Sequence, residues 1–248
     1  MSGAAVITGA ARRIGRVLAV QAARSGYDVA VHHRESADDA EETAALVRAE
    51  GRSACVLAGD LTTRDAADLI GRAAADLGPV TLLVNNASLF LDDRLQTLDA
   101  DGLDAHMATN LRAPAVLAQA FTAQLPADRT GLIVNILDQR VWRPNPQFFS
   151  YSLSKAALWH ATQTMAQALA PRIRVNAIGP GPTLGSVHQV PGEFEQEAAG
   201  TPLARAVSPD EIAAALRYLI DAPSVTGQMI AVDSGQHLGW RTPDIIHP

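Results

Sequence analysis

The chain has 248 residues, of which 48% are apolar and 19% charged, and its formal net charge is −6. This composition fits one α/β domain with a sizeable core, and an acidic chain without a Lys/Arg run gives no support to nucleic-acid binding. Cys55 is the single cysteine, which excludes an internal disulfide. No stretch approaches the roughly 18 apolar residues of a membrane span, and the N-terminal sequence lacks the pattern of a signal peptide. We therefore expect a cytoplasmic protein that binds neither membrane nor nucleic acid.

Short apolar runs alternate along the chain with longer segments of helical spacing. The expected strands are 4–8, 28–31, 53–57, 80–85, 131–136, 173–178 and 229–232, and the expected helices are 13–25, 37–50, 64–77, 100–125, 152–170 and 209–221. Several strands are apolar at consecutive positions, which is typical of strands covered on both faces. The alternation predicts a doubly wound, Rossmann-type α/β fold, with seven parallel strands and helices on both faces in a single domain over 1–248.

The segment 182–203 differs from the rest of the chain. It is rich in Gly, Pro and polar residues and has weak periodicity. A loop of this length in a compact domain is usually functional. We expect a flap over a substrate site, with a plain surface loop as the alternative.

The sequence TGAARRIG at 8–15 follows the first strand and opens the first helix. Gly9 permits a tight turn, Gly15 permits close contact between helix and strand, and the helix N-terminus offers free N–H groups to an anion. These features predict a phosphate-binding turn. Arg13 stands where a dinucleotide fingerprint has its middle glycine, so an ordinary strand–helix turn is the alternative.

The second strand ends in HHR at 32–34. A site for NAD places an acid here to bind the ribose 2′-hydroxyl, whereas Arg34, with Arg12 or Arg13, would bind a 2′-phosphate. We therefore predict NADP(H) as the cofactor, and Glu35 leaves NAD as the alternative. Adjacent histidines on a strand point to opposite faces, so no metal site is expected.

An ordered set of motifs resembles the short-chain dehydrogenase/reductase family over nearly the whole chain. Besides the first turn, these are GDL at 59–61, NNA at 85–87, Asn110, YSLSK at 151–155 and PG at 180–181. The resemblance implies that Asn110, Tyr151 and Lys155 are catalytic. It also implies a cofactor site formed by Gly9, Arg12, Arg13, Ile14, Gly15, His33, Arg34, Asp60, Leu61, Asn86, Ala87, Ser88, Lys155, Pro180, Gly181 and Thr183.

Tyr151 and Lys155 lie one helical turn apart, so both project from the same face. An acceptor of hydride needs a proton, and positive charge on Lys155 would lower the tyrosine pKa from its free value of about 10 toward neutrality. The resemblance further implies that Lys155 holds the nicotinamide ribose and that Asn110 supports a water relay to it.

Most members of this family carry a serine about a dozen residues before the tyrosine, where this chain has Asp138. Ionised aspartate cannot donate a hydrogen bond and would repel a carbonyl oxyanion. The N–H groups of a nitrogen heterocycle suit it, and a protonated carboxyl would pass a proton to a ring nitrogen. The departure resembles the branch of pteridine reductases and dihydromonapterin/dihydrofolate reductases.

Further residues resemble the same branch. The branch has a basic residue that reaches both phosphate and pterin, a serine that touches the cofactor and a phenylalanine that stacks on the pterin. These roles correspond to Arg13, Ser88 and Phe90, and Asp138 and Tyr151 complete the expected substrate site. The alternatives are that Asp138 only caps the following turn, that Phe90 belongs to the core, and that Arg13 contacts phosphate alone.

The resulting hypothesis is an NADPH-dependent reductase of a dihydropterin or dihydrofolate, with Tyr151 as the terminal proton donor. One alternative is a generic NADP-dependent carbonyl reductase in which Asp138 is incidental. Another is a non-catalytic NADP-binding regulator. The resemblance also implies a homotetramer, with the helices at 100–125 and 152–170 in an interface.

Overall fold

The computed structural model describes residues 3–185 and 190–240, which form one α/β domain. Its strands make one parallel sheet in the order β3-β2-β1-β4-β5-β6-β7, so the direction of winding reverses between β1 and β4. This confirms the predicted seven-stranded, doubly wound fold. The strands are β1 (Ala4–Ile7), β2 (Asp28–His33), β3 (Ala54–Ala58), β4 (Val80–Asn85), β5 (Gly131–Ile136), β6 (Ile173–Pro180) and β7 (Met229–Val232).

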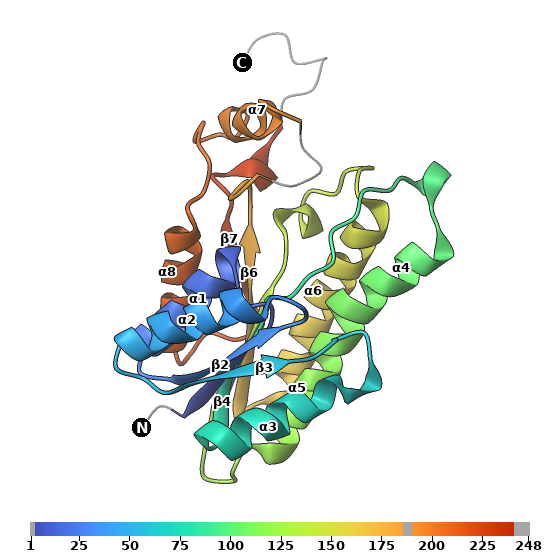
Figure 1. Cartoon of the computed structure of the whole chain (residues 1–248). Helices are drawn as coiled ribbons and strands as arrows, with labels where there is room; N and C mark the ends of the chain where they lie inside the picture. Colours follow the sequence, from blue (N-terminus) through green and yellow to red (C-terminus); the bar gives the residue numbers. More distant parts are fainter. Residues whose placement is uncertain (1–2, 186–189, 241–248) are drawn as a thin grey trace.

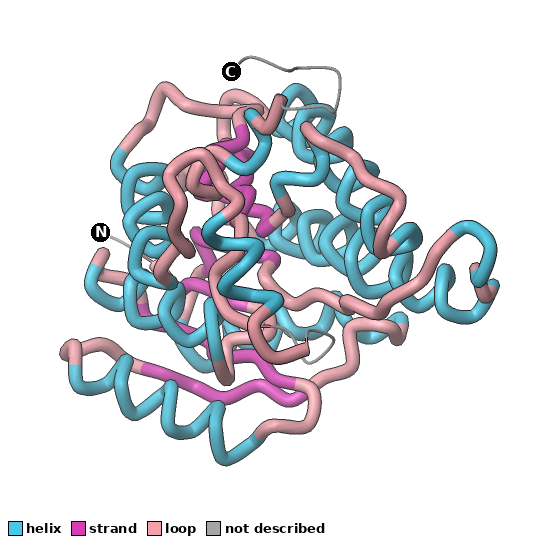
Figure 2. Tube along the Cα trace, turned by 90° about the horizontal axis from the view of Figure 1, so that it is seen from above, coloured by secondary structure: helices cyan, strands magenta, loops and turns pink. Residues whose placement is uncertain are grey.

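Helices cover both faces of the sheet. On one face lie α1 (Arg13–Arg24), α2 (Ala37–Ala49) and α8 (Pro209–Asp221), and on the other lie α3 (Asp68–Leu77), α5 (Ala113–Gln124) and α6 (Phe149–Leu169) (Figure 1). Seen from above, the strands lie between these two groups of helices (Figure 2). The shorter α4 (Ala100–Met107) precedes α5, and α7 (Glu193–Ala199) lies beyond the end of the sheet (Figure 1).

Strand β1 shows why the sheet needs both layers. Its side chains alternate between the faces: Ala5 and Ile7 belong to the core on the α1 side, and Ala4 and Val6 to the core on the α3 side. All four residues are fully buried. Complete burial of a Val or Ile side chain contributes about 1.5–3 kcal/mol, so a consecutive apolar run is stable only between two layers of helices.

The prediction of one continuous helix over 100–125 is wrong, because the helix is interrupted in its middle. A π-helical turn, η3 (Ala108–Arg112), separates α4 from α5. Pro114 at the start of α5 explains the break, because its ring would clash with the carbonyl of Asn110 in a regular α-helix and it has no N–H to donate. The break places Asn110 in the irregular turn, where its side chain is buried.

The structure also adds a helix that the sequence did not predict. Helix α7 lies within 182–203, which was expected to be irregular, while residues 186–189 of that segment lie outside the described residues. The sequence signals for this helix are weak but present: Gly192 directly precedes it, and Glu193 and Glu195 are acids in its first turn.

The described residues contain neither a membrane-spanning helix nor a cluster of metal-ligating side chains. None of the helices in 3–185 or 190–240 is long and apolar enough to cross a membrane. The same residues contain no group of three or more His, Cys, Asp or Glu side chains that could hold a metal ion.

Candidate active site

Two adjoining cavities open where the strands end, the edge at which doubly wound sheets bind ligands. The first, of about 470 Å³, follows the first turn and the ends of β2 and β3. The second, of about 650 Å³, lies over the ends of β5 and β6 and beside α6 and α7. Arg13, Ile14 and Ser88 line both cavities and join them.

The first turn is shaped by close backbone contacts that only glycine allows. Gly9 has φ +61, and a Cβ at Gly15 would lie 2.1 Å from the Gly9 carbonyl oxygen and 2.7 Å from Nδ2 of Asn86. That same nitrogen donates hydrogen bonds to the carbonyls of Thr8 and Gly9 at 2.9 and 3.0 Å. The turn therefore keeps its backbone open toward the cavity at the start of α1, which fits the diphosphate of a dinucleotide.

Basic side chains gather at the far end of this cavity. Arg34 lies 3.1 Å from a carboxylate oxygen of Glu35, and Arg12 lies 3.2 Å from one of Asp39. Both arginine side chains are about 60% exposed, so these pairs are weakly held and can rearrange around an anion. His33 is buried beside them, and its Nδ1 has no partner among the described residues. This set fits a phosphorylated ribose.

His32 has a different role from its neighbour. Its Nδ1 accepts from the amide of Gly9 at 3.1 Å, and its Nε2 lies 3.0 Å from the carbonyl oxygen of Gly59. Burial lowers the pKa of His32 to about 4, so the ring is neutral. His32 thus connects the first turn to the end of β3, a role that sequence reasoning missed because it depends on the pairing of strands.

The structure places each predicted cofactor residue on a cavity wall. Asp60, which accepts from the amide and hydroxyl of Thr62 at 2.8 Å each, has a lowered pKa chiefly because of the backbone bond. Lining the first cavity are Gly9, Arg12, Arg13, Ile14, Gly15, His33, Arg34, Asp60, Leu61, Asn86, Ala87 and Ser88. Lining the second are Lys155, Pro180, Gly181 and Thr183.

Of the predicted catalytic residues, Asp138, Tyr151 and Lys155 meet at the floor of the second cavity, whereas Asn110 is absent from its described lining. Tyr151 and Lys155 come from α6, and Asp138 follows β5. The Tyr151 hydroxyl donates to Oδ2 of Asp138 at 3.0 Å, and Nζ of Lys155 donates to the carbonyl of Ile136 at 2.7 Å. Tyr151 and Lys155 are 7% and 2% exposed, so the charged form of either side chain is poorly solvated.

This burial corrects one expectation from the sequence. Burial raises the pKa of Tyr151 well above its ordinary value, and the Asp138 carboxylate raises it further, while Arg140 opposes the shift. Burial also lowers the pKa of Lys155 to about 8, although Asp138 opposes that change. The prediction that the tyrosine pKa lies closer to neutrality than its free value is therefore wrong for this arrangement. The phenol keeps its proton, as a proton donor must.

Asp138 serves two partners at once. Its Oδ1 accepts from the amide of Arg140 at 2.8 Å and caps the 3-10 turn η4 (Gln139–Val141), while its Oδ2 accepts from Tyr151. The Arg140 guanidinium lies 3.3 Å from Oδ2. Asp138 therefore caps the following turn, as the alternative states, and the same carboxylate also contacts Tyr151. Arg140 was missed from the sequence, although it lies only two residues after Asp138.

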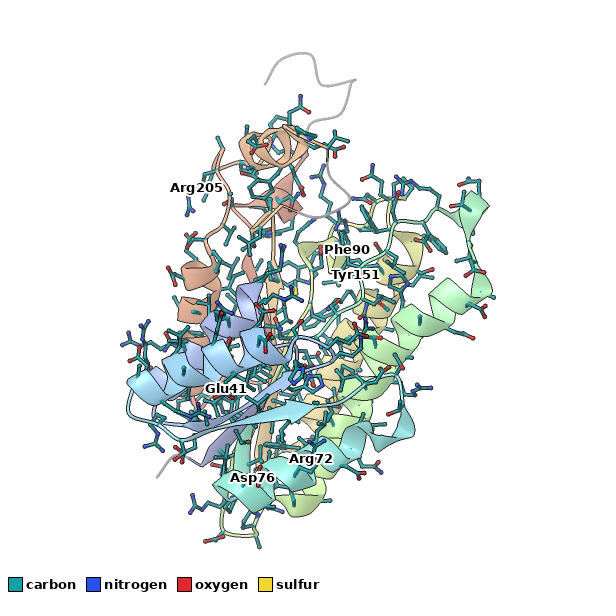
Figure 3. The ribbon with its side chains drawn as sticks, viewed as in Figure 1. Glu41, Arg72, Asp76, Phe90, Tyr151 and Arg205 are labelled. Atoms are coloured by element: carbon teal, nitrogen blue, oxygen red, sulfur yellow. The ribbon has the colours of Figure 1, made fainter. Side chains whose placement is uncertain are left out.

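Aromatic rings form the wall above this floor. Phe90 stacks on Phe148 with centroids 4.2 Å apart and an interplanar angle of 16°, and it meets the edge of Tyr151 at 4.7 Å. Figure 3 shows Phe90 and Tyr151 side by side near the end of the sheet. The Arg140 guanidinium lies 5.4 Å from the Phe148 centroid. Phe90 lines the cavity, and its stacking on a pterin stays a prediction.

Asn110 uses its side chain to hold the segment after β4. Its Oδ1 accepts from the amide of Leu89 at 2.8 Å and the hydroxyl of Ser88 at 3.3 Å, and its Nδ2 donates to the Leu89 carbonyl at 3.0 Å. Nδ2 also donates to the Ser154 hydroxyl at 3.0 Å. The side-chain bonds thus fix this segment, and the water relay to Lys155 stays a prediction.

Arg13 joins the first turn to the segment 182–203. It has φ +54, and its two terminal nitrogens donate to the carbonyls of Gly185 and Leu184 at 3.2 Å each. The neighbouring α7 contributes Glu193 and Phe194 to the lining of the second cavity. Sequence reasoning named the segment but missed these residues, since it did not predict the helix.

Comparison with known proteins agrees with this geometry. A family model described as short chain dehydrogenase matches residues 3–194. FolM alternative dihydrofolate reductase 1 from Brucella canis, complexed with NADP, is 50% identical with a TM-score of 0.94, and the match covers 98% of this chain and 97% of that one. Its counterpart from Brucella suis, also with NADP, is 50% identical with a TM-score of 0.94, covering 98% of each chain.

A second kind of relative is more distant. The 3-oxoacyl-[acyl-carrier-protein] reductase FabG of Staphylococcus epidermidis is 31% identical over 96% of this chain and 100% of that protein. The two kinds of relative share the fold and differ in the substrates their names state. The structures complexed with NADP agree with the cofactor predicted from the basic end of β2.

Proposed function

Because this chain belongs to the short-chain dehydrogenase family and is an NADP-dependent oxidoreductase, we propose that it reduces a dihydropterin or dihydrofolate to the tetrahydro form. One observation carries the proposal: the hydroxyl of Tyr151 is hydrogen-bonded to the carboxylate of Asp138 at the floor of the second cavity. The 50% identity to proteins named dihydrofolate reductase supports it.

The charge on Asp138 favours a nitrogen heterocycle over a ketone. Reduction of a ketone builds negative charge on its oxygen, which a neighbouring carboxylate would repel and to which it has no proton to donate when ionised. The N–H and amino groups of a pterin edge are donors that a carboxylate accepts. Arg140 lies 3.3 Å from the carboxylate and balances its charge.

The proton donor and the cation have separate tasks. NADPH, when bound, supplies the hydride. Tyr151, kept protonated by burial and by Asp138, gives its proton to the substrate. Lys155, with a pKa of about 8, is still charged at neutral pH and stabilises the phenolate as it forms.

We assign the remaining site residues by their place on the cavity walls. The first-cavity residues and Lys155, Pro180, Gly181 and Thr183 hold the cofactor, and Arg13, Ser88 and Phe90 contact the substrate. The described parts of the predicted flap, residues 182–185 and 190–203, cover the substrate, because Leu184, Glu193 and Phe194 line its cavity. The homotetramer and the cytoplasmic location stay predictions.

NADPH oxidation with a panel of substrates tests the proposal. The panel holds 7,8-dihydropterins, dihydrofolate, simple ketones and a 3-oxoacyl thioester, and the proteins are wild type, Asp138→Ser and Asp99→Ser. Asp99 is the matched control, because its side chain also accepts a backbone N–H at a helix start but lies outside both cavities among the described residues.

We expect dihydropterin turnover that falls roughly 100-fold in Asp138→Ser, the scale of a lost acid–base group, and stays unchanged in Asp99→Ser. Turnover of the thioester or ketones, undiminished by Asp138→Ser and with pterins inert, would establish carbonyl reduction, which the FabG relatives favour. Binding of NADPH without oxidation by any substrate would instead support a regulator.

A further inference from the structure

Helix α6 carries the proposed proton donor but has no cap of its own. Its N-cap residue is Phe148, which has φ +52 and makes no side-chain cap hydrogen bond. The left-handed region is uncommon for a large residue. Here the Phe148 ring is used for stacking on Phe90. The first N–H groups of a helix need acceptors, so α6 must find them elsewhere.

Asp93 supplies these acceptors from a distant part of the chain. Its two carboxylate oxygens lie 3.1 and 3.2 Å from the amide nitrogen of Ser150, and Oδ2 also accepts from the Ser150 hydroxyl. Its carbonyl accepts from the amide of Phe149 at 3.3 Å. Ser150 is fully buried. The negative charge also suits the positive end of the helix dipole.

The segment that carries Asp93 is itself held by buried side chains. Residues 86–94 form no helix or strand, yet Asn110 pairs with the amide and carbonyl of Leu89. Nε2 of His106 accepts from the amide of Leu91 at 3.2 Å. Phe90 lies between these two anchored residues, so its backbone is fixed from both sides.

We propose that Asp93 is a positioning residue that fixes Tyr151 and Phe90 relative to each other. Tyr151 directly follows Ser150, and Phe90 comes three residues before Asp93, so one carboxylate joins the two walls of the second cavity. Without this cap the first turn of α6 frays, and the Tyr151 hydroxyl loses its 3.0 Å contact with Asp138. The inference rests on the proposed role of Tyr151 as proton donor.

The test compares Asp93→Ala and Asp93→Asn with Ser208→Ala in the full chain. Ser208 is a matched control, because its side chain caps α8, a helix with no residue on the described lining of either cavity. Both alanine variants should lower Tm by about 2–4 °C, as the loss of one cap does. Only Asp93→Ala should lower kcat for the dihydropterin, by roughly 10- to 100-fold.

Two further readouts distinguish positioning from stability. The KM for NADPH should not change in Asp93→Ala, because Asp93 is absent from the described lining of the first cavity. Asp93→Asn keeps an acceptor oxygen, and asparagine is a good cap, so its kcat should stay within about threefold of wild type. Equal kcat in Asp93→Ala and Ser208→Ala, at equal loss of Tm, would overturn the proposal.

Hydrogen exchange of the NADPH-loaded protein gives a test independent of turnover. The amides of 149–152 should exchange faster in Asp93→Ala than in wild type and be unchanged in Ser208→Ala. Unchanged exchange in Asp93→Ala would refute the cap. If wild type reduced no dihydropterin, the proposed function would fail. The hydrogen-exchange measurement would still test whether Asp93 caps α6.

A milder variant covers the case in which Asp93→Ala does not fold. Ser150→Ala deletes only the hydroxyl that donates to Asp93. It should accelerate exchange at 149–152 and lower kcat roughly threefold to tenfold, which matches the loss of one hydrogen bond. Wild-type exchange and kcat in that variant would also overturn the proposal.

Discussion

The hydroxyl of Tyr151 donates a hydrogen bond to Oδ2 of Asp138 at 3.0 Å, and neither group is well solvated. The proposed proton donor and the carboxylate that replaces the family's usual serine are therefore one coupled pair. The protonation state of this pair controls the chemistry of the second cavity. Arg140, at 3.3 Å from the same oxygen, is the nearby cation that opposes the effect of Asp138 on the phenol.

Replacing Asp138 by asparagine should lower the pKa of Tyr151. The substitution keeps the size of the side chain but removes the negative charge that disfavours the phenolate. An ultraviolet titration of the phenol, taken as the difference between each protein and its Tyr151→Phe counterpart, measures the shift. A pKa that does not move would mean that burial alone sets it.

The same pKa makes stability depend on alkaline pH. In the folded state the pKa of Tyr151 is raised, so above about pH 10 the unfolded chain loses this proton first. The free energy of unfolding should therefore decrease as pH rises above about 10, and Tyr151→Phe should decrease less steeply. Urea denaturation of both proteins across this range measures the difference, and parallel curves would contradict it.

The activity should decrease at alkaline pH because Lys155 loses its proton. Burial lowers its pKa to about 8, so the ammonium that supports the phenolate is lost as pH rises through that value, and kcat should decrease there. In Lys155→Arg, which keeps its charge, the decrease should move to higher pH. A profile of kcat against pH for both proteins is the measurement. If kcat decreased at the same pH in Lys155→Arg as in wild type, a group other than Lys155 would be responsible for the decrease.

The same lysine affects stability with the opposite sign to Tyr151. Between about pH 8 and the unfolded value of about 10.5, the folded chain has lost the proton and the unfolded chain has kept it. The free energy of unfolding should therefore increase across this window in wild type. Lys155→Met should lack the increase, and urea denaturation at a series of pH values would show it.

Arg34 should decide between the two nicotinamide cofactors. Arg34→Ala should raise the KM for NADPH by roughly 10- to 100-fold, because a hydrogen bond to a charged group contributes about 1.5–3 kcal/mol, and should leave the KM for NADH unchanged. Arg24→Ala is the control, since Arg24 pairs with Glu50 outside both described cavity linings. Equal effects on both cofactors would place the 2′-phosphate elsewhere.

Two glycine-to-alanine substitutions should change the free energy of unfolding in opposite directions. At Gly15 a Cβ would lie 2.1 Å from the Gly9 carbonyl oxygen, so Gly15→Ala should destabilise the fold by about 1–3 kcal/mol and weaken NADPH binding. At Gly71 in α3 a Cβ would meet no described atom within 4 Å, so Gly71→Ala should stabilise by about 0.4–1 kcal/mol. Thermal denaturation and NADPH titration compare them.

The order of strands and helices and much of the site follow from local patterns in the chain. Short apolar runs predicted each strand, and the spacing of Tyr151 and Lys155 placed both on one helix face. The position of Asp138 after a strand placed it at the same edge of the sheet. These inferences hold because side-chain period and turn chemistry depend on near neighbours in sequence.

Packing between distant segments settled the rest. The direction of the Tyr151 pKa shift depends on how completely the ring is buried and on its contact with Asp138, thirteen residues away along the chain. The cap of α6 comes from Asp93, 57 residues before Ser150. Desolvation and hydrogen bonds between such segments exist only once the layers have packed, so no local pattern in the sequence contains them.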